Sequence, residues 1–329
     1  MDKFIIYFAG GAMKGIFGAG VATAFEKNNI YPRIKAIYGA SAGVMTGAYF
    51  LSRQTEFGAS IYWENLSKNF VSRKDFIIGA WQRLQDEFIK TVPQNKLRDA
   101  LNIKYLMSIV KNEKRLNTQK IISQNIPLNV KLFNLDTHAI EYVDARRSDI
   151  LKILEAGVNV FPYVHEISII NGKRYIDAAI MDTIGLDFLR RKYPNEKIII
   201  VINGQIERKL RYRIKNIIEG KFMQWMFDDP TLYKLHASAE DKLTKDLKNI
   251  KSDPSVLLIT QKKDVLVRLC TTDANLLLQM YSLGIEAGQH ALQGSFMNSY
   301  SRQPSISSMN SLQSGPGQAG SLQAIYPRP

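Results

Sequence analysis

The sequence predicts an α/β protein in which a central, mostly parallel sheet is flanked by helices in a three-layer arrangement. Two observations carry this prediction. Short, fully apolar runs, such as residues 4–8 and 197–202, are typical of strands buried on both faces of a parallel sheet. A strand–loop–helix–strand–turn–helix order over about the first 50 residues favours parallel strands joined by right-handed crossovers.

The elements follow from hydrophobic periodicity and from turn residues. The predicted strands, in chain order, are 3–8, 34–38, 129–135, 139–143, 167–170, 174–176, 197–202 and 255–260. The predicted helices are 16–28, 42–52, 149–156, two stretches between 205 and 255, and 273–292, and residues 53–125 read as mostly helical. The turn Asn171-Gly172 between two short strands indicates a hairpin.

These elements predict a single domain over residues 1–293. Its motif-bearing part spans about 3–190, and residues 205–293 form a mostly helical extension. Residues 294–329 are rich in Ser, Gln and Gly and contain no acidic residue, so we expect a disordered tail.

The composition, 45% apolar and 22% charged over 329 residues, is ordinary for a globular enzyme. No apolar run reaches the roughly 18 residues that a transmembrane helix needs, and the N-terminus lacks the pattern of a secretory signal peptide. We therefore expect a cytoplasmic protein or one peripheral to a membrane, with non-classical secretion left open. A single cysteine, Cys270, and the absence of metal-ligand motifs predict neither disulfide, metal nor cofactor.

The net charge of +14 favours an anionic partner, either an acidic lipid surface or nucleic acid. One basic stretch, Arg208–Lys221, interleaves positive residues with leucine and isoleucine at helical spacing. Such a helix can lie on a membrane surface, or it can pack on the core with its charged face in solvent.

The segment Gly39-Ala40-Ser41-Ala42-Gly43 is a G-x-S-x-G sequence between an apolar strand and a helix. A tight strand-to-helix turn forces its serine into a strained backbone conformation and exposes the hydroxyl. Glycine is needed on either side because a side chain there would collide with the turn. The helix that follows directs its N-terminal amides at developing negative charge. This pattern predicts a nucleophilic serine at position 41.

The loop Gly10-Gly11-Ala12-Met13-Lys14-Gly15 also lies between a strand and a helix. Its backbone amides can bind a phosphate or the oxyanion of an acyl-transfer intermediate. It is no P-loop, because Ile16 and Phe17 stand where Lys and Ser/Thr are required. It matches a dinucleotide-binding fingerprint loosely, but no acidic residue closes the second strand to hold a ribose.

The partner of the serine is less evident. His138, His165, His236 and His290 are scattered, and the serine follows the second strand, which differs from the order of α/β-hydrolases. Asp177 comes at the end of a short strand and is followed by Ala178 and Ala179. An acid beside such small residues can approach another backbone closely.

These three segments, in this order, resemble the patatin-like phospholipases. That family combines a glycine-rich oxyanion loop, a G-x-S-x-G turn about 25 to 30 residues later, and a distant D-G-G or D-G-A. The resemblance covers about residues 3–190 and extends to the flanks Ala19-Gly20-Val21, Phe161-Pro162 and Tyr175-Ile176, and to Asp182, where members often carry a second aspartate.

The resemblance implies a lipid acyl hydrolase with a Ser41–Asp177 dyad and no histidine. The oxyanion hole would comprise the amides of Gly10, Gly11 and Ala12, and Lys14 would steady the loop or meet a lipid phosphate. Two positions depart from the family, since Ala12 and Ala178 replace glycines. A requirement for positive φ at Ala178 would strain it by about 1 kcal/mol.

Other functions remain open at this stage. A catalytically impaired patatin-like domain could bind lipid or protein, and the loose fingerprint leaves a reductase as an alternative. Nucleic-acid binding has only the charge in its favour, with no recognisable motif, and is not expected. Phospholipid on an anionic membrane is the expected substrate, while head group, chain length and any activating protein are not evident.

Overall fold

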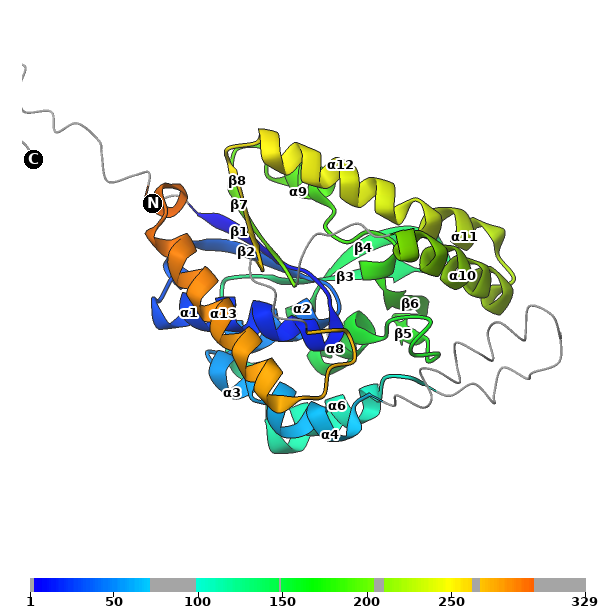
Figure 1. Cartoon of the computed structure of the whole chain (residues 1–329), viewed down its shortest axis with the longest axis horizontal. Coiled ribbons are helices and arrows are strands. Elements are labelled where there is room, and N and C mark those ends of the chain that lie inside the picture. Colours follow the sequence, from blue (N-terminus) through cyan, green and yellow to red (C-terminus); the bar gives the residue numbers. More distant parts are fainter. Residues whose placement is uncertain (1–2, 72–98, 148, 204–209, 262–266, 299–329) are drawn as a thin grey trace, which may run out of the picture.

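The computed structural model describes residues 3–71, 99–147, 149–203, 210–261 and 267–298 (Figure 1). The strands of its single sheet are β1 (Phe4–Phe8), β2 (Ile34–Gly39), β3 (Leu128–Asn134), β4 (Ala139–Asp144), β5 (Ser168–Ile170), β6 (Lys173–Asp177), β7 (Lys197–Ile202) and β8 (Val256–Thr260). Each of the eight strands predicted from the sequence is present, with boundaries shifted by a residue or two.

The sheet order is β5-β6-β3-β2-β1-β7-β8, and β4 pairs with β3 outside this path. Strands β3, β2, β1, β7 and β8 pair in parallel, whereas β4 and β6 run antiparallel to β3. The predicted mostly parallel sheet is therefore confirmed.

Helices cover both faces of this sheet, as Figure 1 shows. The α-helices are α1 (Ile16–Lys27), α2 (Ala42–Leu51), α3 (Thr55–Ala59), α4 (Ser67–Asn69), α6 (Ile103–Ser108), α7 (Thr118–Ile122), α8 (Ile150–Val158), α9 (Leu186–Lys192), α10 (Leu210–Phe227), α11 (Pro230–Ala237), α12 (Ala239–Ser252), α13 (Ala274–Gln293) and α14 (Ser295–Asn298). Helices α1, α2 and α13 lie on one face, and α9 and α12 lie on the other.

Alternate side chains of β1 pack into the cores on the two faces of the sheet. Phe4, Ile6 and Phe8 belong to the core beneath α1 and α2, while Ile5 and Tyr7 belong to the core on the opposite face. All five are completely buried, as expected for a strand covered on both faces. This burial explains why the central strands read as continuous apolar runs.

Several predictions need correction. Helix α9 was not expected, and the segment between β7 and β8 contains three helices where two were predicted. The ordered chain continues past residue 293 into α14, because Phe296 stacks on Phe4 and Met297 is buried. The rest of the predicted tail, residues 299–329, and part of the predicted helical region, 72–98, lie outside the described residues.

Candidate functional site

Ser41 occupies the sharp turn between β2 and α2, as predicted. Its backbone dihedrals are φ 53° and ψ −131°, a conformation that residues other than glycine rarely adopt. The Ser41 amide donates a 2.9 Å hydrogen bond to the carbonyl oxygen of Gly157 at the end of α8, which holds the turn in place. The side chain is almost buried yet lines a cavity. The strained serine expected from the sequence is confirmed.

The two flanking glycines are required for space. A Cβ at Gly43 would lie 2.0 Å from the carbonyl oxygen of Phe8, and a Cβ at Gly39 would lie 2.8 Å from the carbonyl oxygen of Gly43. Both contacts involve backbone, which cannot move aside without disrupting the sheet. The steric reason for the G-x-S-x-G spacing is thus confirmed.

Strand β3 brings Asp177 towards this turn. Its first half pairs with β2, so that Gly39 lies opposite Val130, and its second half pairs with β6, so that Asp177 lies opposite Leu132. Because β4 occupies the other edge of β3 over residues 129–134, β2 and β6 share one edge and meet end to end. Their final residues lie opposite positions two apart on β3, a separation of about 7 Å. Ser41 follows directly after one of these ends.

The Asp177 carboxyl is completely buried. Its Oδ1 accepts a 2.8 Å hydrogen bond from the Ala179 amide. Within the described part of the chain, its Oδ2 is buried and accepts no hydrogen bond. Burial raises the pKa of Asp177 to about 7, although the amide of Ala179, the hydroxyl of Ser41 and the charge of Lys131 act in the opposite direction. The effect of the Ser41 hydroxyl on this pKa indicates that the buried carboxyl lies close to Ser41.

Ala178 and Ala179 form the turn after Asp177, a 3₁₀ helix spanning Ala178–Ile180. Ala178 is buried and does not adopt a positive φ, so the expected strain at this position is absent. Positive φ occurs instead at Ala12, with φ 45°. Of the two alanines that replace family glycines, Ala12 is therefore the strained one, at a cost of about 1 kcal/mol.

The glycine-rich loop lies directly over Ser41 and the Asp177 turn. A Cβ at Gly10 would lie 2.8 Å from the Cβ of Ser41 and 3.3 Å from the Cβ of Ala179, so only glycine permits this approach. Within the described residues, the backbone amides of Gly10, Gly11 and Ala12 donate to no carbonyl. Three unpartnered donors beside a buried hydroxyl can bind a negatively charged oxygen.

Asn203, at the end of β7, secures this loop and was not recognised from the sequence. Its Nδ2 donates to the carbonyl oxygens of Ala9 (2.6 Å) and Gly10 (3.2 Å), and its Oδ1 accepts from the Gly18 amide (2.8 Å). The side chain is buried. The only local signal is a polar residue closing the apolar run 197–202, at the carboxyl end of a central parallel strand, where α/β sheets bind ligands.

Lys14 and Gly15 end the loop. The Lys14 amide donates to the Gly11 carbonyl oxygen at 2.9 Å, and no ion pair of its ammonium group occurs among the described residues. A Cβ at Gly15 would lie 2.3 Å from the Tyr62 hydroxyl and 2.6 Å from the Ala42 Cβ. Gly15 therefore allows the loop, the start of α2 and Tyr62 to pack together.

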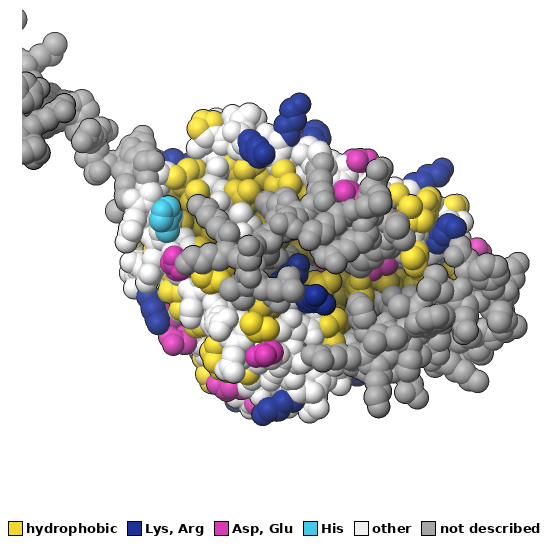
Figure 2. Space-filling view, in the orientation of Figure 1, with side chains coloured by type: hydrophobic (Ala, Val, Ile, Leu, Met, Phe, Trp, Pro, Cys, Tyr) yellow, Lys and Arg dark blue, Asp and Glu magenta, His cyan; other side chains and the backbone are white. Residues whose placement is uncertain are grey.

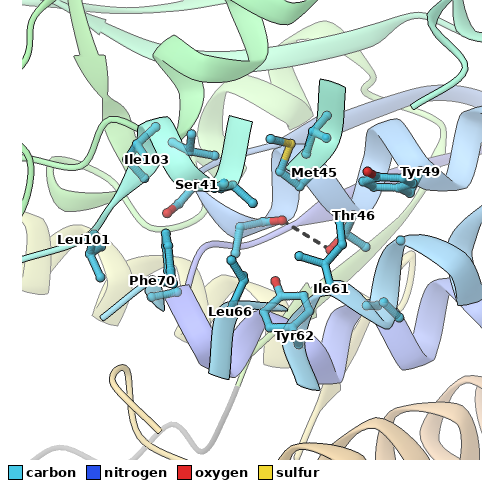
Figure 3. Close-up of a pocket in the computed structure, with 18 of the residues that line it drawn as sticks. Ser41, Met45, Thr46, Tyr49, Ile61, Tyr62, Leu66, Phe70, Leu101 and Ile103 are labelled. Atoms are coloured by element: carbon cyan, nitrogen blue, oxygen red, sulfur yellow. Dashed lines mark hydrogen bonds between the residues drawn. The ribbon is translucent and has the colours of Figure 1, made fainter. Parts of the chain in front are cut away.

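An apolar cavity adjoins Ser41 (Figure 3). Met45 and Tyr49 follow Ser41 at intervals of four residues and line the same face of α2 over about 12 Å. Aliphatic and aromatic side chains from α6 and from residues 61–70 complete the wall, including Leu66, Phe70 and Ile103. A site of this kind suits a hydrocarbon chain.

Three of the four histidines contact other residues in the described structure. His138 pairs with Asp229, His165 with Asp99, and His236 contacts Glu219 and the Ile180 carbonyl oxygen. No described hydrogen bond joins any of them or His290 to Ser41. Asp177 is thus the titratable side chain that the structure brings to the serine.

The pair Lys131–Asp182 lies beneath the Asp177 turn. Lys131 Nζ is completely buried, donates to the Asp182 carbonyl oxygen at 2.6 Å and lies 3.3 Å from its carboxylate. Desolvation lowers the pKa of Lys131, while the carboxylates of Asp182, Asp246 and Asp177 counteract that effect. This contact ties β3 to the chain that follows Asp177.

Over the residues that the structure describes, no cluster of three or more His, Cys, Asp or Glu side chains could hold a metal ion. In the same residues, no helix combines the length and the apolar character needed to cross a bilayer.

Fold and site define an α/β protein with a serine turn beneath a glycine-rich, amide-lined loop. The sequence model of the patatin-like phospholipases matches residues 6–190, and the chain belongs to this family. Family membership supports lipid ester hydrolysis as the class of activity. No sequence among the curated proteins matches this chain.

Comparison with solved structures finds two bacterial proteins at low sequence identity. VipD from Legionella pneumophila is 12% identical with a TM-score of 0.43, and the match covers 91% of this chain and 67% of VipD. The ExoU–SpcU complex of the Pseudomonas aeruginosa type III secretion system contains a chain 11% identical with a TM-score of 0.35, and the match covers 91% of this chain and 52% of that one. The chain therefore spans about half the length of this second neighbour.

Proposed function

We propose that this protein is a lipid acyl hydrolase that cleaves carboxylic esters of phospholipids through an acyl-enzyme on Ser41. The observation that carries the proposal is the convergence of β2 and β6 on one edge of β3, which brings the buried Asp177 carboxyl beside the strained Ser41. A nucleophile, a base and a set of free amides within one apolar site are the components of acyl transfer.

In the first half-reaction, Asp177 accepts the hydroxyl proton as Ser41 Oγ attacks the ester carbonyl carbon. The amides of Gly11 and Ala12, with Gly10, stabilise the negative charge on the tetrahedral oxygen, an effect of roughly 3–4 kcal/mol per donor in other enzymes. The intermediate collapses to an acyl-serine, and Asp177 returns the proton to the departing alcohol oxygen. Water then repeats the same steps and releases the fatty acid.

The raised pKa of Asp177 supports its role as sole base. A carboxylate with an ordinary pKa is too weak a base for a serine hydroxyl, whereas a base with a pKa near the working pH is efficient. Burial raises the pKa of Asp177 to about 7, the range in which histidine usually serves.

The substrate class follows from the cavity and the charge. The apolar wall along α2 accepts an acyl chain, and the net charge of +14 favours an anionic lipid surface. Figure 2 shows Lys and Arg side chains at several separate places on one face, and hydrophobic side chains near α10 and α11. On α10, Ile217 and Trp225 are 45% and 38% exposed, which suits a peripheral contact with membrane. The side chains of the basic residues 208–215 lie outside the described residues.

We expect fatty-acid release from vesicles that contain anionic phospholipid, at a higher rate than from vesicles of zwitterionic phospholipid alone. The difference should shrink as salt is added, because salt screens the attraction between the positive protein and the surface. Release is measured by titration of liberated acid, and labelling by a fluorophosphonate probe reports the activated serine independently.

Labelling of the wild-type protein that disappears in Ser41→Ala supports the proposal. The wild-type protein could instead be neither labelled nor active on any acyl ester. That result would favour the alternative, a catalytically impaired domain that binds lipid or protein. Equal rates on both kinds of vesicle would contradict the anionic-surface part of the proposal alone.

Asn203→Ala is expected to lower kcat/KM by about 10- to 100-fold, because a small displacement of catalytic groups strongly reduces the rate. The loop amides lose the side chain that holds Ala9 and Gly10. Kinetics on a soluble ester and urea denaturation measure the two consequences.

Asn134→Ala is the matched control. Asn134 is equally buried and also makes three hydrogen bonds, to Asp136, Thr137 and Glu141, but at the β3–β4 turn. Both variants should lose about 1–3 kcal/mol of unfolding free energy. Unchanged activity in Asn203→Ala would show that the loop holds its geometry without this residue.

A further inference from the structure

Tyr62 belongs to the turn Tyr62–Leu66 that follows α3, and its ring lines the cavity next to Ser41. The residue is largely buried, with 8% of its surface exposed. Figure 3 shows that the hydroxyl points towards the middle of the residues around the cavity. The mechanism above makes no use of this group.

The Tyr62 hydroxyl lies near the residues on either side of the serine turn and the oxyanion loop. It packs against Gly15, at the end of the oxyanion loop, on the same side as the methyl group of Ala42, the residue after the nucleophile. A hydrocarbon chain cannot accept a hydrogen bond from this hydroxyl. The ester group of a substrate must lie close to it, because the carbonyl carbon has to reach Ser41.

Within the described residues, the Tyr62 hydroxyl has no hydrogen-bond partner, and burial is the sole cause of its raised pKa. The other buried tyrosines all have a bonded hydroxyl, and they are Tyr7, Tyr31, Tyr38, Tyr49, Tyr163, Tyr175, Tyr193 and Tyr281. Tyr62 therefore differs from these tyrosines in having a hydroxyl that is free, in the described structure, to donate to a ligand oxygen in the cavity.

We propose that Tyr62 is a further substrate-binding residue whose hydroxyl donates a hydrogen bond to an oxygen of the ester bound beside Ser41. This assignment rests on the proposed acyl hydrolase function. It gives the apolar cavity one polar contact that distinguishes an acyl ester from a plain hydrocarbon. Gly15 is then required for substrate binding as well, because any side chain there would displace the hydroxyl.

The test compares an ester with a hydrocarbon of similar length in the Ser41→Ala background, which prevents turnover. Methyl decanoate and undecane compete with a fluorescent apolar probe for the cavity. Tyr62→Phe should weaken methyl decanoate binding about tenfold and leave undecane binding unchanged, since it removes one hydroxyl and keeps the ring. Tyr281→Phe is the control, because its equally buried hydroxyl bonds Thr23 outside the cavity.

Equal weakening of both ligands by Tyr62→Phe would overturn the proposal and leave a packing role. No change for either ligand would also overturn it, and would mean that the hydroxyl bonds water alone. In the Ser41-containing enzyme, Tyr62→Phe should lower kcat/KM for a soluble ester about tenfold. Should the wild-type protein hydrolyse no ester, the proposed function fails, while the difference between ester and hydrocarbon binding still decides the role of Tyr62.

Discussion

Ser41→Ala and Ser41→Gly are both expected to reduce fatty-acid release by at least about 10⁴-fold, the scale seen when a nucleophilic serine is removed. The two variants should differ in stability. Ser41 has φ 53° and ψ −131°, and glycine tolerates this conformation, whereas alanine retains the strain.

Urea denaturation should therefore give Ser41→Gly an unfolding free energy about 1 kcal/mol above that of Ser41→Ala. The alanine variant is the matched control, because both substitutions remove the hydroxyl beside Asp177. Turnover within about tenfold of the wild-type rate in either variant would exclude Ser41 as the nucleophile. Equal stabilities would mean that the turn relaxes when the hydroxyl is absent.

Asp177→Asn is expected to lower kcat/KM by about 10³- to 10⁴-fold, because the amide cannot accept the Ser41 proton. In the wild-type protein, kcat/KM should rise with pH through about 7, as the buried carboxyl loses its proton. Asp246→Asn, which alters a carboxyl outside the site, should keep this profile. A profile whose midpoint stays near pH 4 would contradict a buried base.

The same shift predicts an opposite effect on stability. The pKa of Asp177 rises from 3.8 to about 7 on folding, so the folded protein holds this proton more tightly than the unfolded chain. The resulting stabilisation is complete below pH 3.8, falls as the pH rises to about 7, and is absent above that. Loss of this contribution amounts to at most about 4 kcal/mol.

Asparagine does not titrate, so Asp177→Asn does not lose this contribution. Between pH 4 and pH 7 its unfolding free energy should therefore increase relative to that of the wild-type protein. Thermal or urea denaturation at both pH values measures the gain. A variant that is inactive and yet more stable at pH 8 indicates that an ionised carboxyl is maintained for function. A constant difference across this range would mean that Asp177 keeps an ordinary pKa in the fold.

In the proposed mechanism, the proximity of Ser41 and Asp177 allows the serine to act without histidine. Three of the four histidines have other partners in the described structure, and burial raises the basicity of the carboxylate instead. The Ala179 amide, the Ser41 hydroxyl and the charge of Lys131 keep the pKa of Asp177 from rising further. The charge state of Asp177 therefore depends on a balance between desolvation and these hydrogen bonds and this cation.

Interactions between residues near in sequence were sufficient to predict most of the strands and the serine turn. Burial on both faces makes the central strands apolar, so β1, β2 and β7 were predicted almost to the residue. The serine turn was equally predictable, because the steric requirement for glycine at positions 39 and 43 acts within five residues. Helix α9 was missed because its seven residues, LDFLRRK, carry too short an apolar pattern to identify a helix.

Only the tertiary structure decided what surrounds the serine. Asp177 reaches Ser41 because β3 pairs with two strands in succession along one edge, and that register has no signature in either segment. Asn203 and Tyr62 looked like an ordinary strand-end residue and an ordinary core residue, although one holds the oxyanion loop and the other directs an unpaired hydroxyl into the cavity. Short-range sterics and burial act on neighbouring residues and can be read from the chain, whereas hydrogen bonds between distant segments exist only after the sheet has assembled.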